Sequence, residues 1–221
     1  MNYCAIVLAA GSGKRTGLNF NKVLYPYQGR PILDYSLDVF EADDECKEII
    51  VVVAEHEIEE MKQQFMRSKT KFVIGGNERQ DSVFNGLQQT SQPYVLIHDG
   101  ARPFVSANLI ERIKTALQDH RAVVPGVEVV DTIKEIDENG YFSKSLIRSK
   151  LRAVQTPQAF QTDLIMQALQ IVKQDHIAVT DDAMAVELVM HVQSYCVEGE
   201  LANFKVTSPL DLQQLENQSQ A

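Results

Sequence analysis

Runs of consecutive apolar residues alternate along the chain with stretches in which apolar residues recur every three or four positions. A continuous apolar run is typical of a strand buried on both faces, and the three-to-four spacing is typical of an amphipathic helix. The runs predict strands at residues 3–10, 48–54, 71–74, 94–98 and 122–124. Strands and helices in this alternating order predict an α/β fold, a Rossmann-like, doubly wound and mostly parallel sheet with helices on both faces.

The predicted helices lie between and after these strands. In the stretch PILDYSLDVF, Pro31 suits a first helical position, and Leu33, Leu37 and Phe40 supply one apolar face. The same spacing predicts helices around residues 58–65, 83–87 and 109–117, and later in DLIMQALQIVK and DDAMAVELVMH. The residues predicted to cap helix N-termini all carry hydroxyl groups, and they are Ser106, Thr162, Thr180 and Ser208.

Residues 127–155 depart from this rhythm. Apolar and polar residues alternate on both sides of an Asn139-Gly140 turn signal, which predicts a β-hairpin arm projecting from the sheet. An isolated hairpin is only marginally stable in water, so we expect the arm to pack against a second copy of the chain in a homodimer. The alternative is a hairpin folded back on its own domain. No Pro/Gly/Ser-rich linker divides residues 1–221, which we therefore expect to form one domain.

The charge balance limits the classes of ligand. The chain has 21 Lys and Arg against 30 Asp and Glu, a net charge of -9, which argues against nucleic-acid binding but allows a small anion in a local basic pocket. The N-terminus leads directly into a core strand, without a signal-peptide pattern or a span of membrane length, so we expect a cytoplasmic protein with no membrane partner. Cys4, Cys46 and Cys196 suggest neither a disulfide framework nor a zinc site and are expected to be buried thiols.

The segment LAAGSGKRTGLNFNK, residues 8–22, has the glycines and cations of a phosphate-binding loop. It does not fit the dinucleotide fingerprint, because Thr16 stands where the third glycine is required, nor the ATPase loop, because Arg15 follows the Gly-Lys pair. The glycines nevertheless expose backbone N–H groups at the carboxyl end of a strand, and Lys14, Arg15 and Lys22 follow. An anion site is therefore favoured over a structural turn with solvated charges.

Three further clusters follow predicted strands, at the edge of the sheet where ligands bind in this architecture. The segment GGNERQDSV, residues 75–83, places two glycines, an amide, a cation and a hydroxyl just before a helix. Such a loop could surround a planar base and present hydrogen-bonding groups to its edge. Taken alone, it is better explained as a connection between a strand and a capped helix.

The segment IHDGARPF is more informative. Asp99 follows a buried strand, Gly100 lets the backbone approach a ligand closely, and Arg102 places a cation beside the carboxylate. Mg²⁺ is typically held by one or two carboxylates together with phosphate oxygens, so Asp99 is a candidate ligand when an anionic phosphate is bound. His98 has no second His or Cys at ligand spacing, and we expect a packed histidine at the strand end.

The other candidate residues give weak signals when each is taken alone. Lys205, in NFKVTSPLDL, is expected on a short strand, where a lysine is usually solvated. Thr132 and Arg148 are expected on the surface of the arm. The acidic pair at residues 181–182 is explained most simply by acids in a first helical turn that favour the helix dipole.

Taken together, these motifs resemble those of the 2-C-methyl-D-erythritol 4-phosphate cytidylyltransferases of the non-mevalonate isoprenoid pathway. The matching segments cover the chain almost from end to end, and they are LAAGSGKR, NK at residues 21–22, GRPIL, GGNERQDSV, HDGARPF, DTIK, TPQAF, TDDA and NFKVTSPLDL. The ribitol-5-phosphate cytidylyltransferases share much of this frame, but LAAG and HDGARPF resemble the isoprenoid enzymes more closely. The sequence departs from the family pattern at Thr16 and Val23, which affects loop packing more than catalysis.

The resemblance implies a nucleotidyltransferase that transfers CMP from CTP to 2-C-methyl-D-erythritol 4-phosphate, giving CDP-methylerythritol and pyrophosphate. The alternative is transfer to D-ribitol 5-phosphate in cell-wall polyol synthesis. The resemblance also implies Mg²⁺, or another divalent cation, as cofactor, and a homodimer formed through the arm at residues 127–155.

The family pattern further implies a role for each matching residue. The residues implied to bind CTP are Ala9, Ala10, Gly11, Ser12, Gly76, Asn77, Ser82 and Gly100. Those implied to surround the triphosphate and stabilise the transition state are Arg15, Lys22 and Lys205. Asp99 is implied to bind Mg²⁺. Those implied to hold the methylerythritol phosphate are Arg102, Thr132 and Arg148, the last reaching across from the arm of the partner subunit.

Two hypotheses from other classes remain. An NAD-dependent oxidoreductase would use the same sheet, but the glycine fingerprint fails and no acidic residue is placed to meet a ribose after the second strand, although Glu55 is near that place. A nucleotide sensor without catalysis would keep the loops but lose the cations, which this chain retains.

Overall fold

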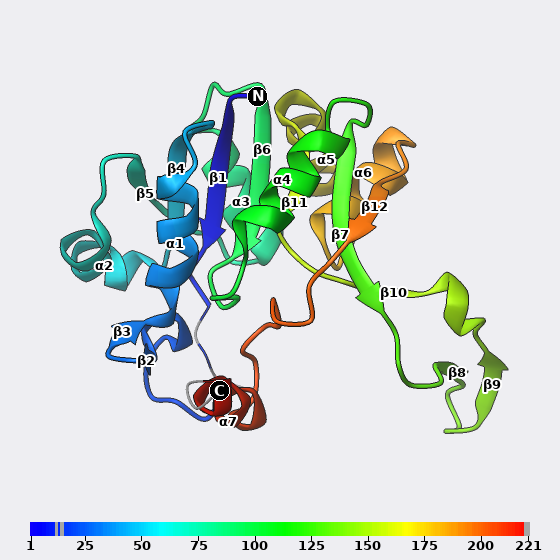
Figure 1. Ribbon diagram of the computed structural model, residues 1–221. Helices are drawn as coiled ribbons and strands as arrows, with labels where there is room; N and C mark the ends of the chain where they lie inside the picture. The colour runs from blue at the N-terminus through cyan, green and yellow to red at the C-terminus, as the bar shows by residue number, and fades with distance from the viewer. Residues whose placement is uncertain (12, 14–15, 219–221) are drawn as a thin grey trace.

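The computed structural model describes residues 1–11, 13 and 16–218 of the chain. Within these residues, a sheet of eight strands forms the centre of the molecule (Figure 1). Its strands are β1 (Tyr3–Leu8), β4 (Cys46–Val53), β5 (Thr70–Ile74), β6 (Tyr94–Asp99), β7 (Ala122–Glu128), β10 (Arg152–Val154), β11 (Gln158–Gln161) and β12 (Tyr195–Glu198). The strand order is β10-β7-β11-β6-β1-β4-β5, and β12 also pairs with β7.

Parallel pairing dominates this sheet. β1 pairs in parallel with β4 and β6, β4 with β5, and β7 with β12, whereas β10 and β11 run antiparallel to their neighbours. The predicted doubly wound and mostly parallel sheet is therefore confirmed. The apolar pattern predicted neither β11 nor β12, because both are short and β12 is largely exposed.

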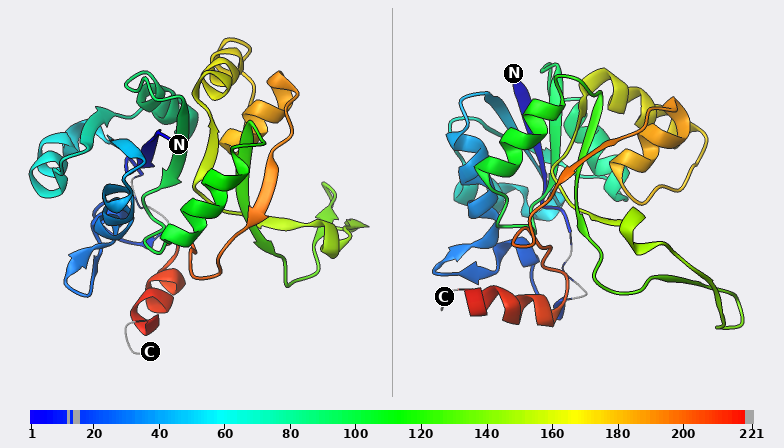
Figure 2. Two further views of the ribbon diagram at one scale, coloured as in Figure 1. Left: turned by 45° about the horizontal axis from the view of Figure 1, so that its top comes forward. Right: turned by 45° about the vertical axis from the view of Figure 1, so that its right-hand side comes forward.

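In the described part of the chain, three helices cover each face of the sheet (Figures 1 and 2). On one face lie α1 (Ile32–Ala42), α2 (Ile58–Phe65) and α4 (Ala107–Ala116), and on the other lie α3 (Arg79–Leu87), α5 (Thr162–Gln174) and α6 (Asp182–Met190). Side chains of β1 alternate between the two layers, so that Ala5 and Val7 pack on the first face and Cys4 and Ile6 on the second. Burial on both faces explains why the strand sequence is continuously apolar.

Two predicted helix starts are confirmed. Ser106 caps α4 by accepting a hydrogen bond from the Leu109 amide at 3.0 Å. Ser208 caps α7 (Pro209–Asn217) and exchanges capping-box hydrogen bonds with Asp211. The prediction for Pro31 was one residue early, because Pro31 pairs in the short strand β3 (Arg30–Pro31) and is the N-cap residue of α1.

The predictions for Thr162 and Thr180 were wrong. Thr162 is already helical, and its hydroxyl donates to the Gln92 carbonyl at 2.6 Å. The cap of α6 is Asp181, whose carboxylate accepts from the Met184 amide at 2.9 Å. An aspartate beside the helix start is as good a cap as threonine, so the hydroxyl pattern alone misplaced the boundary.

The cysteines divide into two groups. Cys4 and Cys46 are buried as expected, but Cys196 is exposed on β12, so its predicted burial was wrong. None of the helices in the described part of the chain is long and apolar enough to cross a membrane.

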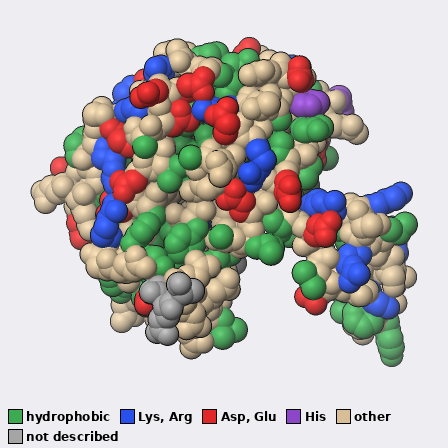
Figure 3. Space-filling view, in the orientation of Figure 1, with side chains coloured by type: hydrophobic (Ala, Val, Ile, Leu, Met, Phe, Trp, Pro, Cys, Tyr) green, Lys and Arg blue, Asp and Glu red, His purple; other side chains and the backbone are tan. Residues whose placement is uncertain are grey.

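The predicted hairpin arm projects from the body in all three views (Figures 1 and 2). It consists of β8 (Lys134–Ile136) and β9 (Phe142–Ser145), followed by the one-turn helix η4 (Arg148–Lys150). Gly140, with a φ of 87°, adopts the left-handed conformation that the turn requires. Apolar side chains gather on the arm beside lysines and arginines (Figure 3), and those that are strongly exposed are Val130, Ile136, Tyr141, Phe142 and Ile147.

The topology determines where a ligand can bind. From β1 the chain continues to β4 and β5 on one side of the sheet and then crosses to β6 on the other side of β1. Leu8 and Asp99, the last residues of β1 and β6, are paired neighbours at this switch point. Below them, α7 packs through Leu215 against Tyr27 and Ile32. The carboxyl ends of β1 and β6 therefore border the crevice in which ligands of doubly wound sheets bind.

Candidate active site

A cavity of about 380 Å³ lies at the carboxyl ends of β1 and β6. Many residues predicted to bind ligand lie in its wall, and they are Ala10, Gly11, Lys22, Gly76, Asn77, Ser82, Asp99 and Lys205. They come from the segment after β1, from the loop after β5 with the first turn of α3, from the end of β6 and from the segment before α7. The fold thus brings together four sequence clusters that are far apart along the chain.

Other predicted residues lie behind the cavity wall. The Ala9 amide donates to the Val52 carbonyl at 2.7 Å, and its carbonyl accepts from the Asn21 amide group at 2.6 Å. Gly100 is buried, and a Cβ there would lie 2.9 Å from the Leu8 carbonyl oxygen. These two positions shape the backbone beneath the cavity. The predictions for Ser12 and Arg15 concern positions outside the described residues.

The predicted substrate residues of the arm are not in this cavity. Thr132 is exposed, and the Arg148 guanidinium donates to the Val130 carbonyl at 2.7 Å within the arm. Arg102 is buried beside the cavity and donates to the Asn203 carbonyl at 2.8 Å. The Nε of Arg102 lies 3.8 Å from the Asp99 carboxylate, whereas Thr132 and Arg148 of the same chain lie outside the cavity wall.

The geometry around Lys205 corrects one prediction. Residues 203–207 do not form the expected strand. The Val206 amide donates to the Ala101 carbonyl at 2.9 Å, and the Asn203 carbonyl accepts from Arg102, so both bonds hold the segment beside the end of β6. This attachment brings the Lys205 ammonium to 2.8 Å from Oδ2 of Asp99.

Asp99 is surrounded by cations. In addition to Lys205, the Nε atoms of Arg79 and Arg102 lie 3.7 Å from Oδ1 and 3.8 Å from Oδ2. Burial alone would raise the pKa of Asp99, but Lys205, Arg79 and Arg102 lower this pKa to about 2. The carboxylate is therefore ionised at neutral pH. Three cations around one carboxylate, at a glycine-rich edge, make a site suited to an anionic ligand.

His98 supports this arrangement from beneath. It is 0% exposed, its Nε2 lies 3.0 Å from the Arg102 carbonyl, and its Nδ1 lies 3.1 Å from the Thr156 hydroxyl. Because the Arg102 carbonyl can only accept, Nε2 carries the proton, and Nδ1 accepts from the Thr156 hydroxyl, which in turn accepts from the Asp99 amide at 3.1 Å. Burial lowers the pKa of His98 to about 4. The expectation of a packed histidine at the strand end is confirmed.

We predict that His98 makes the stability of the protein sensitive to mild acid. Its pKa is lowered from 6.5 to about 4 on folding, so the unfolded chain binds the extra proton between these values. The stabilisation is complete above pH 6.5 and is lost as the pH falls towards 4, by about 3 kcal/mol. Urea unfolding at pH 7.5 and 4.5 measures this loss, and His98→Gln should show a smaller one. An equal loss in both proteins would contradict the prediction.

Sequence reasoning missed an ion pair between Arg79, a partly exposed residue of the cavity wall, and the buried Asp182. The Arg79 guanidinium donates from both terminal nitrogens to the two oxygens of Asp182, each at 2.8 Å, and Asp182 is 1% exposed. Asp182 thus does more than favour a helix dipole. The one available signal is the doubled acid at residues 181–182, because a helix needs only one acid as its cap.

Ser82 also stabilises the loop between β5 and α3 in this wall. Its hydroxyl accepts from the Gly76 amide at 3.0 Å and donates to the Glu78 carbonyl at 3.2 Å. A Cβ at Gly76 would collide with the Cβ of Asp81. The loop after β5 is therefore folded tightly onto the start of α3, where it presents Asn77 to the cavity.

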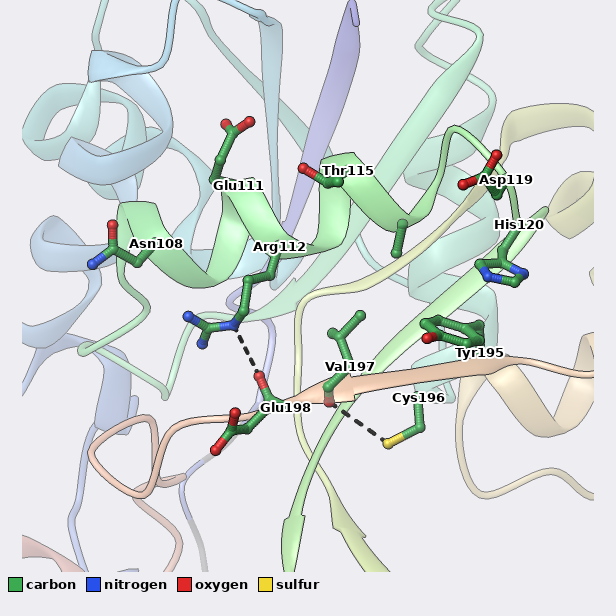
Figure 4. Close-up of a pocket in the computed structure, with 11 residues that line it drawn as sticks. Asn108, Glu111, Arg112, Thr115, Asp119, His120, Tyr195, Cys196, Val197 and Glu198 are labelled. Carbon is green, nitrogen blue, oxygen red and sulfur yellow. Dashed lines mark hydrogen bonds between the residues drawn. The ribbon is translucent and has the colours of Figure 1, made fainter.

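A larger cleft of about 690 Å³ lies between α4 and β12 (Figure 4). Its wall contains none of the residues predicted to bind ligand. His120 stacks on Tyr195 with ring centroids 3.9 Å apart, and Arg112 donates to the Glu198 carbonyl at 3.2 Å. Acidic and basic side chains are mixed along this cleft, so it lacks the positive character found around Asp99.

The doubly wound sheet, the glycine-rich loop after β1 and the cations around Asp99 together define a nucleotidyltransferase of the α/β class. A family model described as IspD, 2-C-methyl-D-erythritol 4-phosphate cytidylyltransferase, matches residues 3–218. The chain belongs to this family.

Similar proteins span nearly the same length. The 2-C-methyl-D-erythritol 4-phosphate cytidylyltransferase of Bacillus cereus (strain ATCC 10987 / NRS 248) is 43% identical over 215 residues, covering 95% of this chain and 94% of its own. That of Geobacillus kaustophilus (strain HTA426) is 44% identical over 218 residues, covering 96% and 94%. The crystal structure of 4-diphosphocytidyl-2C-methyl-D-erythritol synthase from Anaerococcus prevotii DSM 20548 matches with a TM-score of 0.89 at 30% identity, covering 100% and 99%.

Proposed function

We propose that this chain transfers CMP from CTP to 2-C-methyl-D-erythritol 4-phosphate, releasing pyrophosphate. The observation that carries the proposal is the group of cations around the cavity at the switch point, where Lys22 and Lys205 line the wall and Arg79 and Arg102 flank Asp99. Membership of the 2-C-methyl-D-erythritol 4-phosphate cytidylyltransferase family supports this substrate over ribitol 5-phosphate.

The proposed reaction needs charge neutralisation more than proton transfer. An oxygen of the methylerythritol phosphate attacks the α-phosphorus of CTP, and the bond to the β-phosphate breaks with its electrons leaving on pyrophosphate. The attacking phosphate is already anionic, so no strong base is required. This agrees with His98, whose two ring nitrogens are both occupied. Lys22 and Lys205 would stabilise the charge that develops on the phosphate oxygens, and the implied role of Arg15 stays a prediction.

The cavity wall also suits a nucleotide base. Its volume of about 380 Å³ falls within the range common for small-ligand sites. Ala10 and Gly11, from the segment after β1, and Gly76 and Asn77, from the loop after β5, all line the cavity and supply backbone groups and one amide side chain. We propose that cytosine and its ribose lie between these loops, with the triphosphate towards Lys205.

The donor set fits a divalent cation that is held mainly by phosphate oxygens. The described residues contain no group of three or more His, Cys, Asp or Glu able to hold a metal by themselves. Asp99, ionised and lining the cavity, can supply one carboxylate oxygen, which is a common protein share for Mg²⁺. We propose that Mg²⁺ binds there with CTP, where it would neutralise phosphate charge.

We further propose a homodimer in the cytoplasm, assembled through the arm. The exposed apolar side chains of the arm, such as Tyr141 at 73% and Phe142 at 72%, would be covered by a second copy of the chain. Thr132 and Arg148 of one subunit would then reach the methylerythritol phosphate beside Arg102 of the other. The negative net charge gives no support for nucleic acid as a partner.

The test is pyrophosphate release from CTP and Mg²⁺, measured side by side with 2-C-methyl-D-erythritol 4-phosphate and with D-ribitol 5-phosphate. We expect release with the first substrate alone. Release with ribitol phosphate alone would retain the chemistry but overturn the substrate assignment. No release with either would contradict catalysis and favour a nucleotide sensor.

A further inference from the structure

The two oxygens of the Asp99 carboxylate have different surroundings. Oδ2 is in direct contact with the Lys205 ammonium at 2.8 Å. Oδ1 faces the Nε of Arg79 at 3.7 Å, which is too long for a hydrogen bond. An arginine next to an ionised carboxylate in a partly buried site would normally close this distance and form a charge-assisted hydrogen bond. Some other group must therefore restrain Arg79.

Asp182 supplies this restraint. It binds both terminal nitrogens of Arg79 at 2.8 Å, a bidentate geometry that fixes the plane of the guanidinium. Asp182 is itself held rigidly as the first residue of α6. The neighbouring Asp181 accepts from the side chain of Gln158 at 2.8 Å, and the Ala183 amide donates to the same side chain at 3.0 Å. The carboxylate that holds Arg79 is thus anchored to the sheet through β11.

We propose that Asp182 is a positioning residue that holds Arg79 away from Asp99, and so keeps Oδ1 accessible to the divalent cation that accompanies CTP. This inference rests on the proposed function. From its restrained position Arg79 stays 3.7 Å from Oδ1 and does not hydrogen-bond this oxygen. Released from Asp182, Arg79 would pair with Oδ1 and compete with the metal, because both are cations directed at one oxygen.

The experiment measures coupling between the metal and the nucleotide. Titration calorimetry gives the affinity of the protein for CTP with and without Mg²⁺, in the absence of any polyol phosphate, so that no turnover occurs. In the wild type we expect Mg²⁺ to increase the affinity for CTP. In Asp182→Asn this increase should be about tenfold smaller, which is within the usual range for coupling between two ligands. Metal-free CTP affinity should change by less than about twofold. A purely structural defect would weaken CTP binding in both conditions.

The double variant Arg79→Gln/Asp182→Asn provides the decisive comparison. It removes the competing cation together with its restraint and leaves no buried charge unpaired, so we expect metal coupling close to that of the wild type. Glu200→Gln is the matched control, because it also removes a carboxylate paired with an arginine. Glu200 lies 2.8 Å from Arg112, and neither residue lines the cavity. This control should leave the coupling unchanged.

Three results separate the inference from the function on which it rests. Wild-type coupling in Asp182→Asn, or lost coupling in the double variant, would overturn the role of Asp182. If Asp182→Asn does not fold, as circular dichroism would show, the double variant decides alone. Wild-type protein that neither binds CTP nor releases pyrophosphate would instead contradict the proposed function.

Discussion

Replacing Lys205 with methionine is expected to lower kcat for pyrophosphate release by about a thousandfold, while the affinity for CTP falls less than about tenfold. The Lys205 ammonium lines the cavity and lies 2.8 Å from Asp99. A fixed cation at this place stabilises charge that grows on the phosphate oxygens as the new bond forms, so its loss affects the transition state more than the bound nucleotide. Methionine keeps the length of the side chain and removes its charge.

Steady-state kinetics at saturating CTP and Mg²⁺, with CTP affinity measured separately, tests this expectation. Lys71→Met is the matched control, because Lys71 is also paired with a carboxylate, Glu48 at 2.7 Å, but lies at the start of β5, away from the cavity. The control should retain wild-type kcat. A kcat for Lys205→Met within tenfold of the wild type would contradict a direct role in catalysis.

The sequence predicted the core strands because their pattern has a physical cause that acts locally. Strands such as β1 and β4 are buried on both faces, so nearly every residue is apolar. β11 is different, because Gln158–Gln161 becomes a strand only by pairing with β6 on one side and β7 on the other. Conversely, residues 203–207 alternate like a strand but find no partner strand. Pairing between distant segments, which a local pattern does not record, decided both cases.

In the candidate site, too, some features could be predicted from local sequence and others depend on contacts between distant segments. Asp99 could be predicted because it directly follows a buried strand, and the topology brings such ends together. The contact between Arg79 and Asp182 could not, since it joins residues 103 positions apart on two different helices. The backbone positions Ala9 and Gly100 contact Val52 and Leu8, and their role in binding CTP stays a prediction. Local sequence locates a site, whereas the orientation of its groups depends on tertiary packing.

The second large effect concerns the arm. Deleting residues 133–147, between Thr132 and Arg148, is expected to give a monomer whose activity is lower by about a hundredfold or more, because without a dimer Arg148 cannot reach the substrate phosphate of a partner subunit. In the described chain Arg148 contacts only its own arm, through the Val130 carbonyl, and is not in the cavity wall. Sedimentation and pyrophosphate release measure the two consequences. A fully active protein after deletion would contradict a site shared between subunits.

Mixed dimers give a sharper version of this prediction. Lys205→Met and Arg148→Ala subunits should each be nearly inactive alone. When the two are co-expressed and assort at random, half of the dimers are mixed, and each mixed dimer has one site with both residues intact, so about a quarter of wild-type activity should return. If Arg148 instead served the cavity of its own chain, every site would lack one residue, and no activity would return. Recovery therefore requires that the arm of one subunit completes the active site of the other.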